Sequence, residues 1–511
     1  MSSDFRQKIK TRDDVARIIG TRPRSRTVVM CHGTFDIVHP GHLRHLAYAK
    51  GKADVLIASI TADAQVTKAE YRPYVPEELR AVNLAALEIV DFVIIDPNAT
   101  PIENILFLQP DFFAKGYEYF ATGIPIRTRE EIAALRSYGG EMIFTPGDVV
   151  YSSSALIESH PPKIAVEKLL ILMESEGIGF SDLRTTVEQF PGAHVHVVGD
   201  TIVDAYSDCS VLGATAKSPT LSIRLEKKEE FAGGAAAVAK HMRATGADVS
   251  LSTVLGGDRP REFIEQEMAE AGIRLHTVID KMRPTTYKER FFADGSKLLQ
   301  VDRVDNRPVS EGALERIGES LHSGRADAVV FSDFRHGIFN RQTVGMLREY
   351  IPSGALTVAD SQVSSRWGNI LDFAEFDLLT PNEREARFAL ADQDSVIRPL
   401  ALKLFQAARC RWLILKLGER GLLGYRTPGP KPREFFTVDS LADPVVDPIG
   451  AGDALLAYAS LAQRVSGNIV IAAILGSAAA AVSCERKGNV SVTPPEVIAK
   501  IDAVEKLARY Q

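Results

Sequence analysis

The sequence predicts an α/β protein built from two doubly wound domains, each a parallel sheet with helices on both faces. Short apolar, strand-like runs alternate with helical patterns along nearly all of the 511 residues, an order typical of parallel sheets. The alternation stops between residues 160 and 190, where the apolar spacing is helical. A chain of this length also exceeds what one hydrophobic core usually serves. We therefore expect a first domain at residues 1–159, a helical linker at 160–190 and a second domain at 191–511.

Five buried strands are expected in the first domain, each followed by polar residues and a helical segment: residues 27–30, 55–59, 92–95, 112–114 and 142–144. A further strand at 194–198 opens the second series, which runs to the end of the sequence. No sequence repeat relates the two series, so duplication of one unit does not explain them.

The composition indicates a soluble globular protein of the cytoplasm. Hydrophobic residues make up 45% and charged residues 25%, and the net charge of −6 gives no overall field that favours nucleic acid or an anionic membrane. The apolar stretches are too short to span a bilayer, and the first residues lack the apolar core of a secretory signal. The four cysteines form no CxxC pair, which favours a reducing compartment.

The sharpest local motif is CHGTFDIVHPGH at residues 31–42, where a strand runs into a glycine turn and a helix begins near Pro40. His39 and His42 are three residues apart and would project near one another from the start of that helix. Backbone amides and the positive end of the helix favour a triphosphate there, and the imidazoles could stabilise charge that develops on its α-phosphate. Two ordinary histidines at a helix start would give the same spacing, so other motifs must decide.

Three later motifs follow in order: RPYVPEELR at 72–80, KGYEY at 115–119 and YSSSALI at 151–157. With the first motif they resemble the cytidylyltransferase-like nucleotidyltransferases over residues 26–158, and most of all the adenylyltransferase half of bifunctional heptose kinase/ADP-heptose synthases. The resemblance implies a Rossmann-like fold and catalytic roles for His39 and His42. It also implies that nucleotide and phosphates are bound by Gly33, Thr34, Phe35, Lys68, Arg72, Lys115, Ser152, Ser153 and Ser154. For Lys68 a solvated surface lysine stays an open alternative, because Ala69 stands where the family has a glycine.

A second phosphate-binding pattern is DPIGAGD at 447–453, which precedes the helical ALLAYASLAQ. Gly450 and Gly452 would let the backbone approach a phosphate closely, and the helix start would point its amides at developing negative charge. The carboxylate of Asp453 could accept the proton of an attacking sugar hydroxyl. GAGD alone is short and would also fit a simple turn.

Other motifs support the phosphate-binding interpretation: HVVGDTIVD at 196–204, GGAA at 233–236, TPNERE at 380–385 and KLGERG at 416–421. They stand in the order found in ribokinase-like (PfkB) sugar kinases, which the chain resembles over residues 192–505. By that resemblance Asp453 is the base, and Gly450, Ala451 and Gly452 form the anion hole. It places the nucleotide near Lys416, Gly418 and Gly421, the sugar near Asp200, Asp204, Gly233 and Gly234, and Mg²⁺ near Asn382 and Glu385.

The expected sugar side combines features of heptose kinases with departures from them. PTTYKER at 284–290 resembles their T-x-K-x-R stretch, and FSDFRHG at 331–337 resembles their SDYxKG segment. Lys288 and Arg290 are two apart on a strand and could grip a phosphate together, although two exposed strand charges would give the same pattern. Ala237 stands where sugar kinases usually carry an asparagine that reads the sugar, and Gln300 where an arginine is expected. Kinase chemistry therefore follows more firmly than heptose as its substrate.

These patterns favour a two-step enzyme whose domains stand in the reverse order of the enzymes they resemble. The kinase half would phosphorylate a sugar phosphate, such as a heptose 7-phosphate, at its anomeric position with ATP and Mg²⁺. The transferase half would join the sugar 1-phosphate to a nucleotide, as in ADP-heptose, and release pyrophosphate.

Two alternatives stay open. One is a CTP-dependent cytidylyltransferase with a kinase of matching specificity for another phosphorylated sugar or polyol. The other is a transferase regulated by a catalytically silent kinase-like module that senses a sugar phosphate. The expected partners are ATP or CTP and sugar phosphates, without nucleic acid or membrane, and the resemblance to ribokinases adds a homodimer formed through the kinase domain.

Overall fold

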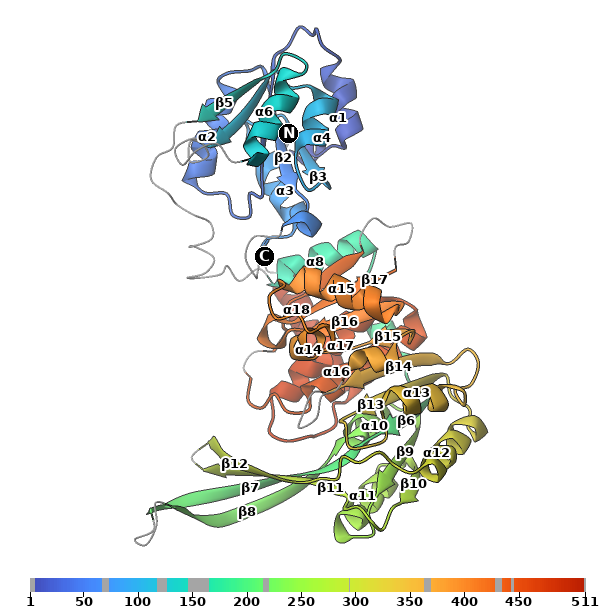
Figure 1. Ribbon diagram of the computed structural model, residues 1–511. Coiled ribbons are helices and arrows are strands. Elements are labelled where there is room, and N and C mark those ends of the chain that lie inside the picture. The colour runs from blue at the N-terminus through green and yellow to red at the C-terminus, as the bar shows by residue number, and fades with distance from the viewer. Residues whose placement is uncertain are drawn as a thin grey trace. The chain divides into compact units, whose positions relative to one another are not determined.

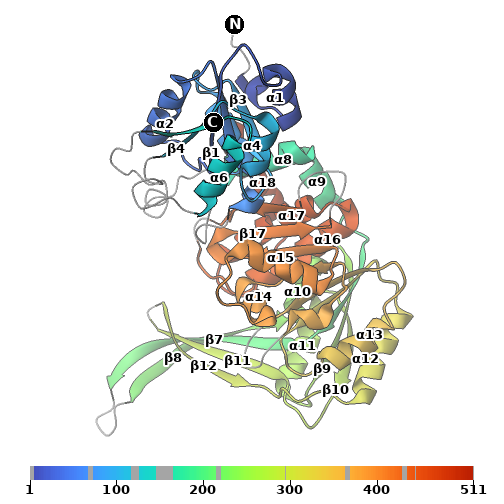
Figure 2. The ribbon, with the colours of Figure 1, turned by 45° about the horizontal axis from the view of Figure 1, so that its top comes forward.

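The computed structural model describes residues 5–66, 73–116, 126–145, 165–214, 220–293, 295–362, 369–427, 434–442 and 445–509. The chain divides into two compact units, Met1–Ile164 and Ala165–Gln511 (Figures 1 and 2). Each unit contains a sheet of mainly parallel strands flanked by helices, which confirms the predicted α/β class. Within the described ranges, none of the helices combines the length and apolar character that crossing a membrane requires.

The first unit is built on a five-stranded parallel sheet with the order β3-β2-β1-β4-β5. Strand addition reverses direction between β1 and β4, and in open parallel sheets ligands bind beyond the carboxyl ends of the strands at such a switch point. The elements are η1 (Phe5–Lys8), α1 (Arg12–Ile19), β1 (Val28–Gly33), α2 (Pro40–Lys50), β2 (Val55–Thr61), η2 (Asp63–Gln65), α3 (Glu77–Ala85), β3 (Phe92–Asp96), α4 (Ile102–Leu108), β4 (Phe112–Gly116), α6 (Ile126–Arg136) and β5 (Glu141–Thr145).

Both faces of this sheet are covered, and the side chains of β1 show how. Val29 and Cys31 pack in the cluster that includes α2 and α3, whereas Val28 and Met30 pack in the cluster that includes α1, α4 and α6. Successive residues of a strand point to opposite faces, so a strand covered on both sides is apolar throughout. This is why the sequence shows continuous apolar runs at these strands.

The second unit has a nine-stranded sheet of order β10-β9-β6-β13-β14-β15-β16-β17-β18. Its strands are parallel except for β17, which runs antiparallel to β16 and β18, and its switch point lies between β6 and β13. The strands are β6 (His194–Gly199), β9 (Asp248–Leu255), β10 (Arg274–Ile279), β13 (Ala328–Asp333), β14 (Leu356–Ser361), β15 (Leu378–Leu379), β16 (Trp412–Lys416), β17 (Leu422–Arg426) and β18 (Phe435–Val438).

Two layers of helices enclose the large sheet. One hydrophobic cluster contains residues of α8, α9, α10, α11, α16, α17 and α18, and a second contains residues of α12, α13, α14 and α15. The bounds are α10 (Ala235–Ala244), α11 (Arg259–Glu270), α12 (Glu311–Ser323), α13 (Arg341–Arg348), η3 (Ile370–Phe373), α14 (Glu383–Leu390), α15 (Ile397–Ala408), η4 (Gly418–Arg420), α16 (Ala451–Ser466), α17 (Ile469–Cys484) and α18 (Pro494–Arg509).

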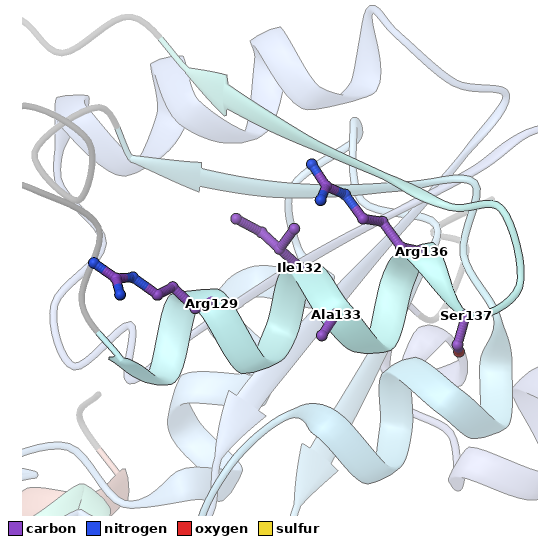
Figure 3. Close-up of a pocket in the computed structure, with 5 residues that line it drawn as sticks. All are labelled: Arg129, Ile132, Ala133, Arg136 and Ser137. Atoms are coloured by element: carbon purple, nitrogen blue, oxygen red, sulfur yellow. The ribbon is translucent and has the colours of Figure 1, made fainter.

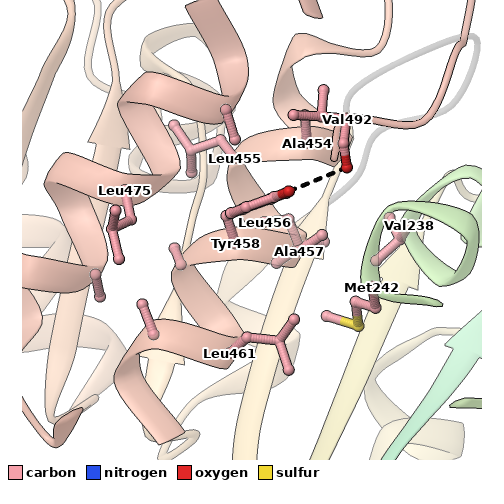
Figure 4. Packing of buried hydrophobic residues seen from close by; sticks show 14 of the residues in the cluster. Val238, Met242, Ala454, Leu455, Leu456, Ala457, Tyr458, Leu461, Leu475 and Val492 are labelled. Carbon is pink, nitrogen blue, oxygen red and sulfur yellow. Dashed lines mark hydrogen bonds between the residues drawn. The ribbon is translucent and has the colours of Figure 1, made fainter. Parts of the chain in front are cut away.

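The alanine-rich pair α16 and α17 forms the centre of the first layer. Small side chains let helices pack closely, and Figure 4 shows residues of α16, α17 and α10 gathered around Tyr458. Tyr458 is fully buried and donates a hydrogen bond to the carbonyl of Val492 at 3.0 Å, so its polar end is satisfied. This packing fixes the start of α16, where the DPIGAGD motif lies.

Four further strands form a separate sheet of order β12-β11-β7-β8 that extends from the rest of the second unit (Figures 1 and 2). They are β7 (Thr201–Ala214), β8 (Leu221–Gly234), β11 (Thr286–Ala293) and β12 (Ser296–Arg303). We call this sheet the flap. β7 follows β6 directly, so the flap begins at the switch point of the large sheet.

The segment expected to link the two domains forms α8 (Ala165–Glu176) and α9 (Phe180–Glu188), and both helices pack within the second unit. Lys168 pairs with Asp439 at 3.0 Å, and Glu176 pairs with Arg426 at 2.7 Å. The compact second unit therefore begins at Ala165 rather than at residue 191.

Candidate active sites

In the first unit, His39 caps the helix that follows β1. Its Nδ1 accepts a hydrogen bond from the amide of Gly41 at 3.1 Å. A Cβ at Gly41 would lie 2.8 Å from Cε1 of His39, closer than side chains pack. Glycine at this position therefore lets the imidazole fold back over the first turn of α2.

The second histidine of the motif lies against the first. The rings of His39 and His42 stack with centroids 4.0 Å apart, and Phe35 meets His42 edge-on at 5.1 Å. Nδ1 of His42 donates to the carbonyl of Ile37 at 3.1 Å. Partial burial lowers the pKa of His39. Because Nδ1 of neutral His39 is an acceptor, its proton is on Nε2, which makes that nitrogen a donor for a phosphate oxygen.

Arg80 and Asp36, which also belong to the sequence motifs, hold the turn between β1 and α2. Arg80 is fully buried and donates to the carbonyls of Val75 and Thr61, both at 2.9 Å, and of Thr34. The carboxylate of Asp36 accepts from the amide of Val75 at 2.7 Å. These contacts fix the backbone of Thr34 and Phe35 beside Gly33, at the carboxyl end of β1.

Lys115 ends β4, next to β1 at the switch point. Its ammonium donates to Oγ1 of Thr128 at 3.0 Å and forms an ion pair with Glu131, both on α6. Burial lowers the pKa of His32, on β1, to about 4, and the charge of Lys115 adds to the effect. Lys115 therefore lies where the sequence motif requires it, but a phosphate would have to compete with Glu131 for its charge.

The other residues proposed for this site, Lys68, Arg72, Ser152, Ser153 and Ser154, lie outside the described residues. A pocket on the first unit runs along α6, lined by Arg129, Ile132, Ala133, Arg136 and Ser137 (Figure 3). Of the proposed site residues that the structure describes, none lines this pocket.

In the second unit, Asp453 lies in the first turn of α16 and is buried, with 6% of its surface exposed. Within the described part of the chain, its Oδ1 has no hydrogen-bond partner. Burial raises the pKa of Asp453 to about 8, and the nearby carboxylate of Asp360 adds to the rise. A buried carboxylate with a free oxygen and a raised pKa is suited to accept a proton from a substrate hydroxyl.

The turn before Asp453 requires glycine. Gly450 has φ +85°, and a Cβ there would lie 2.0 Å from Oδ1 of Asn489. The Cβ position of Gly452 lies 3.6 Å from Nζ of Lys416. Gly450, Ala451 and Gly452 thus bring the start of α16 close to a buried cation, a combination suited to a phosphoryl group.

Lys416, at the end of β16, donates to both oxygens of Asp360, at 2.9 and 2.8 Å. Burial disfavours its charged form, but the carboxylates of Asp360, Glu385 and Asp453 together outweigh burial, and the pKa of Lys416 is raised. Asp360 belongs to none of the sequence motifs that predicted this site. It could have been predicted as a site residue, because it lies at the end of the apolar run LTVADS and polar residues at the carboxyl ends of parallel strands often bind ligands.

Asn382 and Glu385, proposed near Mg²⁺, form a capping box at the start of α14. Oδ1 of Asn382 accepts from the amide of Glu385 at 2.9 Å, and Glu385 accepts from the amide and the side chain of Asn382 at 2.7 and 2.6 Å. Among the described residues, no group of three or more histidine, cysteine or acidic side chains is arranged to hold a metal ion. The side chains of Asn382 and Glu385 are thus already hydrogen-bonded to each other in this structure.

The turn after β16 contains the glycines proposed near the nucleotide. Gly418 and Gly421 have φ +62° and +83°, and a Cβ at Gly421 would lie 2.1 Å from the carbonyl oxygen of Val438. The turn is thus pressed against the end of β18.

On the proposed sugar side, three residues meet where the flap joins the large sheet. Arg290 pairs with Asp204 at 2.7 Å, and a Cβ at Gly233 would lie 2.1 Å from Oδ2 of Asp204. Gly234 has φ +61° and approaches the carbonyl of Asp200. Burial lowers the pKa of Lys288, against the opposing charge of Asp204. The ion pair with Asp204 already compensates the charge of Arg290.

Asp200 serves the backbone of a neighbouring loop. Its Oδ2 accepts from the amides of Phe334 and His336 at 2.9 and 3.1 Å. Asp333 and Arg335, in the same loop, form a buried ion pair. Burial raises the pKa of Asp333 to about 7, with Arg335 opposing the rise. We did not predict this network from the sequence, because it is assembled from strand ends that are far apart in the chain.

The fold and the glycine turns define the class of each unit: a Rossmann-like nucleotidyltransferase and a ribokinase-like kinase. Residues 193–495 match the pfkB family carbohydrate kinase model, and residues 30–159 match the cytidylyltransferase-like model. The chain therefore belongs to the pfkB carbohydrate kinase family and carries an additional cytidylyltransferase-like domain.

Curated relatives are named as bifunctional proteins. The chain is 27% identical over 339 residues to the bifunctional protein HldE of Desulfatibacillum aliphaticivorans, covering 64% of this chain and 66% of the relative. It is 28% identical over 312 residues to the bifunctional protein HldE of Rhodopseudomonas palustris strain TIE-1, covering 60% and 62%. The match thus spans just under two thirds of these relatives.

Solved structures resemble the kinase fold. Crystal structures of phosphofructokinase-2 from Escherichia coli, in complex with fructose-6-phosphate and with potassium, match with TM-scores of 0.50 and 0.51 at 15% identity. Each match covers 61% of this chain and 99% of the solved chain. At this identity the likeness establishes the fold.

We expect Gly41→Ala to lower the transferase rate by about 10²-fold, because the added Cβ displaces the His39 ring and small displacements of positioned groups carry costs of that order. Gly51→Ala is the matched control at the other end of α2, where φ is −65° and a Cβ makes ordinary contacts. Pyrophosphate release from a nucleoside triphosphate and a sugar 1-phosphate is the measurement. Equal rates in the two variants would refute this role of Gly41.

The raised pKa of Asp453 predicts the pH profile of the kinase. The base form is the carboxylate, so kcat/KM for ATP should rise with pH and level off above about pH 8. Asp360→Asn should move this limb to lower pH, because it removes a negative neighbour and frees the charge of Lys416. A flat profile between pH 6 and 9 in the wild type would contradict the assignment.

Proposed function

We propose that the chain is a bifunctional enzyme of sugar-nucleotide synthesis. The kinase unit transfers a phosphoryl group from ATP to the anomeric hydroxyl of a sugar phosphate, such as a heptose 7-phosphate. After another enzyme has removed the original phosphate, the transferase unit joins the sugar 1-phosphate to a nucleotide. The observation that carries the proposal is the buried, partly unpaired carboxylate of Asp453 beside the glycine turn of α16, in one chain with the stacked pair His39 and His42.

In the kinase step, Asp453 takes the proton of the attacking hydroxyl. The amides at the start of α16 and the ammonium of Lys416 compensate charge on the transferred group. The free oxygen of Asp453 and the 3.6 Å approach of Lys416 to the Gly452 position support this arrangement. Asn382 and Glu385 would hold Mg²⁺ through its bound waters. When bound, the ion would neutralise charge on the nucleotide phosphates.

In the transferase step, the sugar phosphate attacks the α-phosphorus and pyrophosphate leaves. His39 donates through Nε2 to a phosphate oxygen, and the start of α2 adds its amides. No covalent enzyme intermediate is needed, because positioning and charge compensation suffice. All four cysteines are free and buried, which fits an enzyme of the reducing cytoplasm.

The test uses the full chain with ATP or CTP and a panel of sugar phosphates and sugar 1-phosphates. Asp453→Asn should lower ATP consumption in the kinase assay about 10²- to 10⁴-fold, the range expected for loss of a general base. Pyrophosphate release should stay unchanged in that variant, because His39 and His42 belong to the other unit.

Three results would change the proposal. Pyrophosphate release with CTP alone would replace the ADP-sugar product by a CDP-linked one. Absence of ATP consumption by the wild type on every acceptor would favour a silent, sugar-phosphate-sensing module. Equal ATP consumption by wild type and Asp453→Asn would remove Asp453 from the reaction.

We also propose that the enzyme forms a homodimer through the flap. Apolar side chains are exposed on several of its strands: Val211, Leu212, Leu221, Leu225, Leu298, Leu299 and Val301. Exposed apolar groups that gather on one element favour association with another surface. A second copy of the flap is the occupant that the ribokinase-like class suggests.

The double variant Leu299→Lys/Val301→Lys should convert the dimer to a monomer in light scattering, because these residues share one face of β12 and a buried charge there is costly. Ile279→Lys, which changes an exposed residue of β10 outside the flap, is the control and should stay dimeric. A monomeric wild type, or a dimer that survives the double variant, would refute the flap interface.

A further inference from the structure

A small polar pocket lies at the switch point of the second unit, where β6 passes into β7. Its lining includes Asp200, Thr201, Arg283, Asp305 and His336. None of the contacts assigned to the kinase reaction above uses Thr201 or His336.

Two buried polar atoms on this lining lack partners. Thr201 and His336 are 3% and 4% exposed, and within the described residues Oγ1 of Thr201 and Nδ1 of His336 have no hydrogen-bond partner. Buried polar groups are almost always hydrogen-bonded, because leaving them unpaired forfeits their contacts with water. Both residues line the same pocket, so a polar group bound there would supply the partners that these atoms lack.

The backbone holds both residues rigidly. The amide of His336 donates to Asp200 at 3.1 Å, and its carbonyl accepts from Arg283 at 3.0 Å. Thr201 opens β7 and pairs with Gly234 of β8. The backbone of both residues is therefore fixed before any ligand enters, which favours specific recognition.

The charges of the lining favour an uncharged group. Of the described residues that line the pocket, only Arg283 is cationic, and it already donates to the carbonyls of His336 and Arg307 and to Asp280. The carboxylates of Asp200 and Asp305 would repel a phosphate. Burial lowers the pKa of His336 to about 3, and Lys288 and Arg283 add to the effect, so the imidazole is neutral.

The pocket lies on the acceptor side of the catalytic base. Asp200 lines the pocket and Thr201 pairs with Gly234, and both Asp200 and Gly234 were proposed to lie near the sugar. The nucleotide-side residue Lys416 lies instead beside Gly452 and Asp360.

We propose that Thr201 and His336 form a subsite for one uncharged hydroxyl of the phosphoryl acceptor, at a position other than the hydroxyl that is phosphorylated. That hydroxyl accepts from Oγ1 of Thr201 and donates to Nδ1 of His336. A phosphate dianion has no proton to donate to Nδ1. The inference rests on the proposed kinase function and adds a specificity site to it.

The test compares each acceptor that supports turnover in the full-length enzyme with its monodeoxy analogues. The wild type should prefer the parent over one particular analogue by about 10²-fold or more in kcat/KM, because a site built to bind a hydroxyl rejects a ligand without it. Thr201→Val and His336→Leu should each reduce that one preference at least tenfold and leave the preferences at other positions unchanged. The controls Thr201→Ser and His336→Asn keep a polar atom near each position and should retain most of it.

A second measurement does not depend on turnover. The imidazole ¹⁵N resonances of His336 are followed in the full chain during titration with heptose 7-phosphate, fructose 6-phosphate and ribose 5-phosphate. A shift of the Nδ1 resonance that Thr201→Val weakens supports the subsite, even where no acceptor is phosphorylated and the kinase proposal has failed.

Two outcomes would overturn the inference. One is turnover with deoxy preferences that neither Thr201→Val nor His336→Leu alters, which would assign the pocket to a structural water only. The other is the absence of any His336 shift with all three sugar phosphates.

Discussion

Both proposed sites depend on the same constraint: a polar side chain occupies the space that a Cβ would fill if the neighbouring glycine were any other residue. The His39 ring occupies the space beside Gly41, and the Asn489 amide occupies the space beside Gly450. In each case the glycine begins or precedes a helix, so the polar group is held against the helix start and its amides. The geometry of the proposed phosphate sites thus depends on the positions of the glycines as much as on the polar and reactive side chains.

In each unit, a described lysine of the proposed site is already paired. Lys115 is held by Glu131, and Lys416 by Asp360. Removing one partner of a buried pair is costly, so each lysine keeps its place without a ligand. A bound phosphate must share the lysine with its carboxylate or replace that carboxylate. Phosphate binding is therefore an exchange of ion-pair partners. This exchange favours ligands whose phosphate groups are fully ionised, because they compete best with the carboxylate.

Local sequence patterns determined much of the fold in advance. The strands covered on both faces, such as β1 and β13, are continuous apolar runs, and their alternation with helices predicts the class. The positions of His39 and His42 followed from a short motif, because three residues along a helix start bring side chains together. Asp453 at the start of α16 followed from GAGD for the same local reason.

What the sequence did not reveal depends on contacts between distant segments. The helical pattern of α8 and α9 was clear, but their attachment to the second unit depends on partners such as Asp439 and Arg426, more than 200 residues away. Asp360 meets Lys416 across two strand ends, and His336 meets Asp200 across the switch point. No local spacing encodes such pairs.

In the second unit, some polar residues of the proposed kinase site already have hydrogen-bond or ion-pair partners, whereas a few buried polar atoms have none. Asp200, Asp204 and Arg290 look like sugar contacts in the sequence, yet Asp200 is engaged by backbone amides, and Asp204 and Arg290 by each other. Among the described residues, the buried atoms without partners include Oδ1 of Asp453, Oγ1 of Thr201 and Nδ1 of His336. A ligand gains most from groups that have no partner before it binds, because satisfied groups must first give up a bond. The proposed subsite therefore depends on unpaired atoms, in addition to the charged residues that the motifs emphasise.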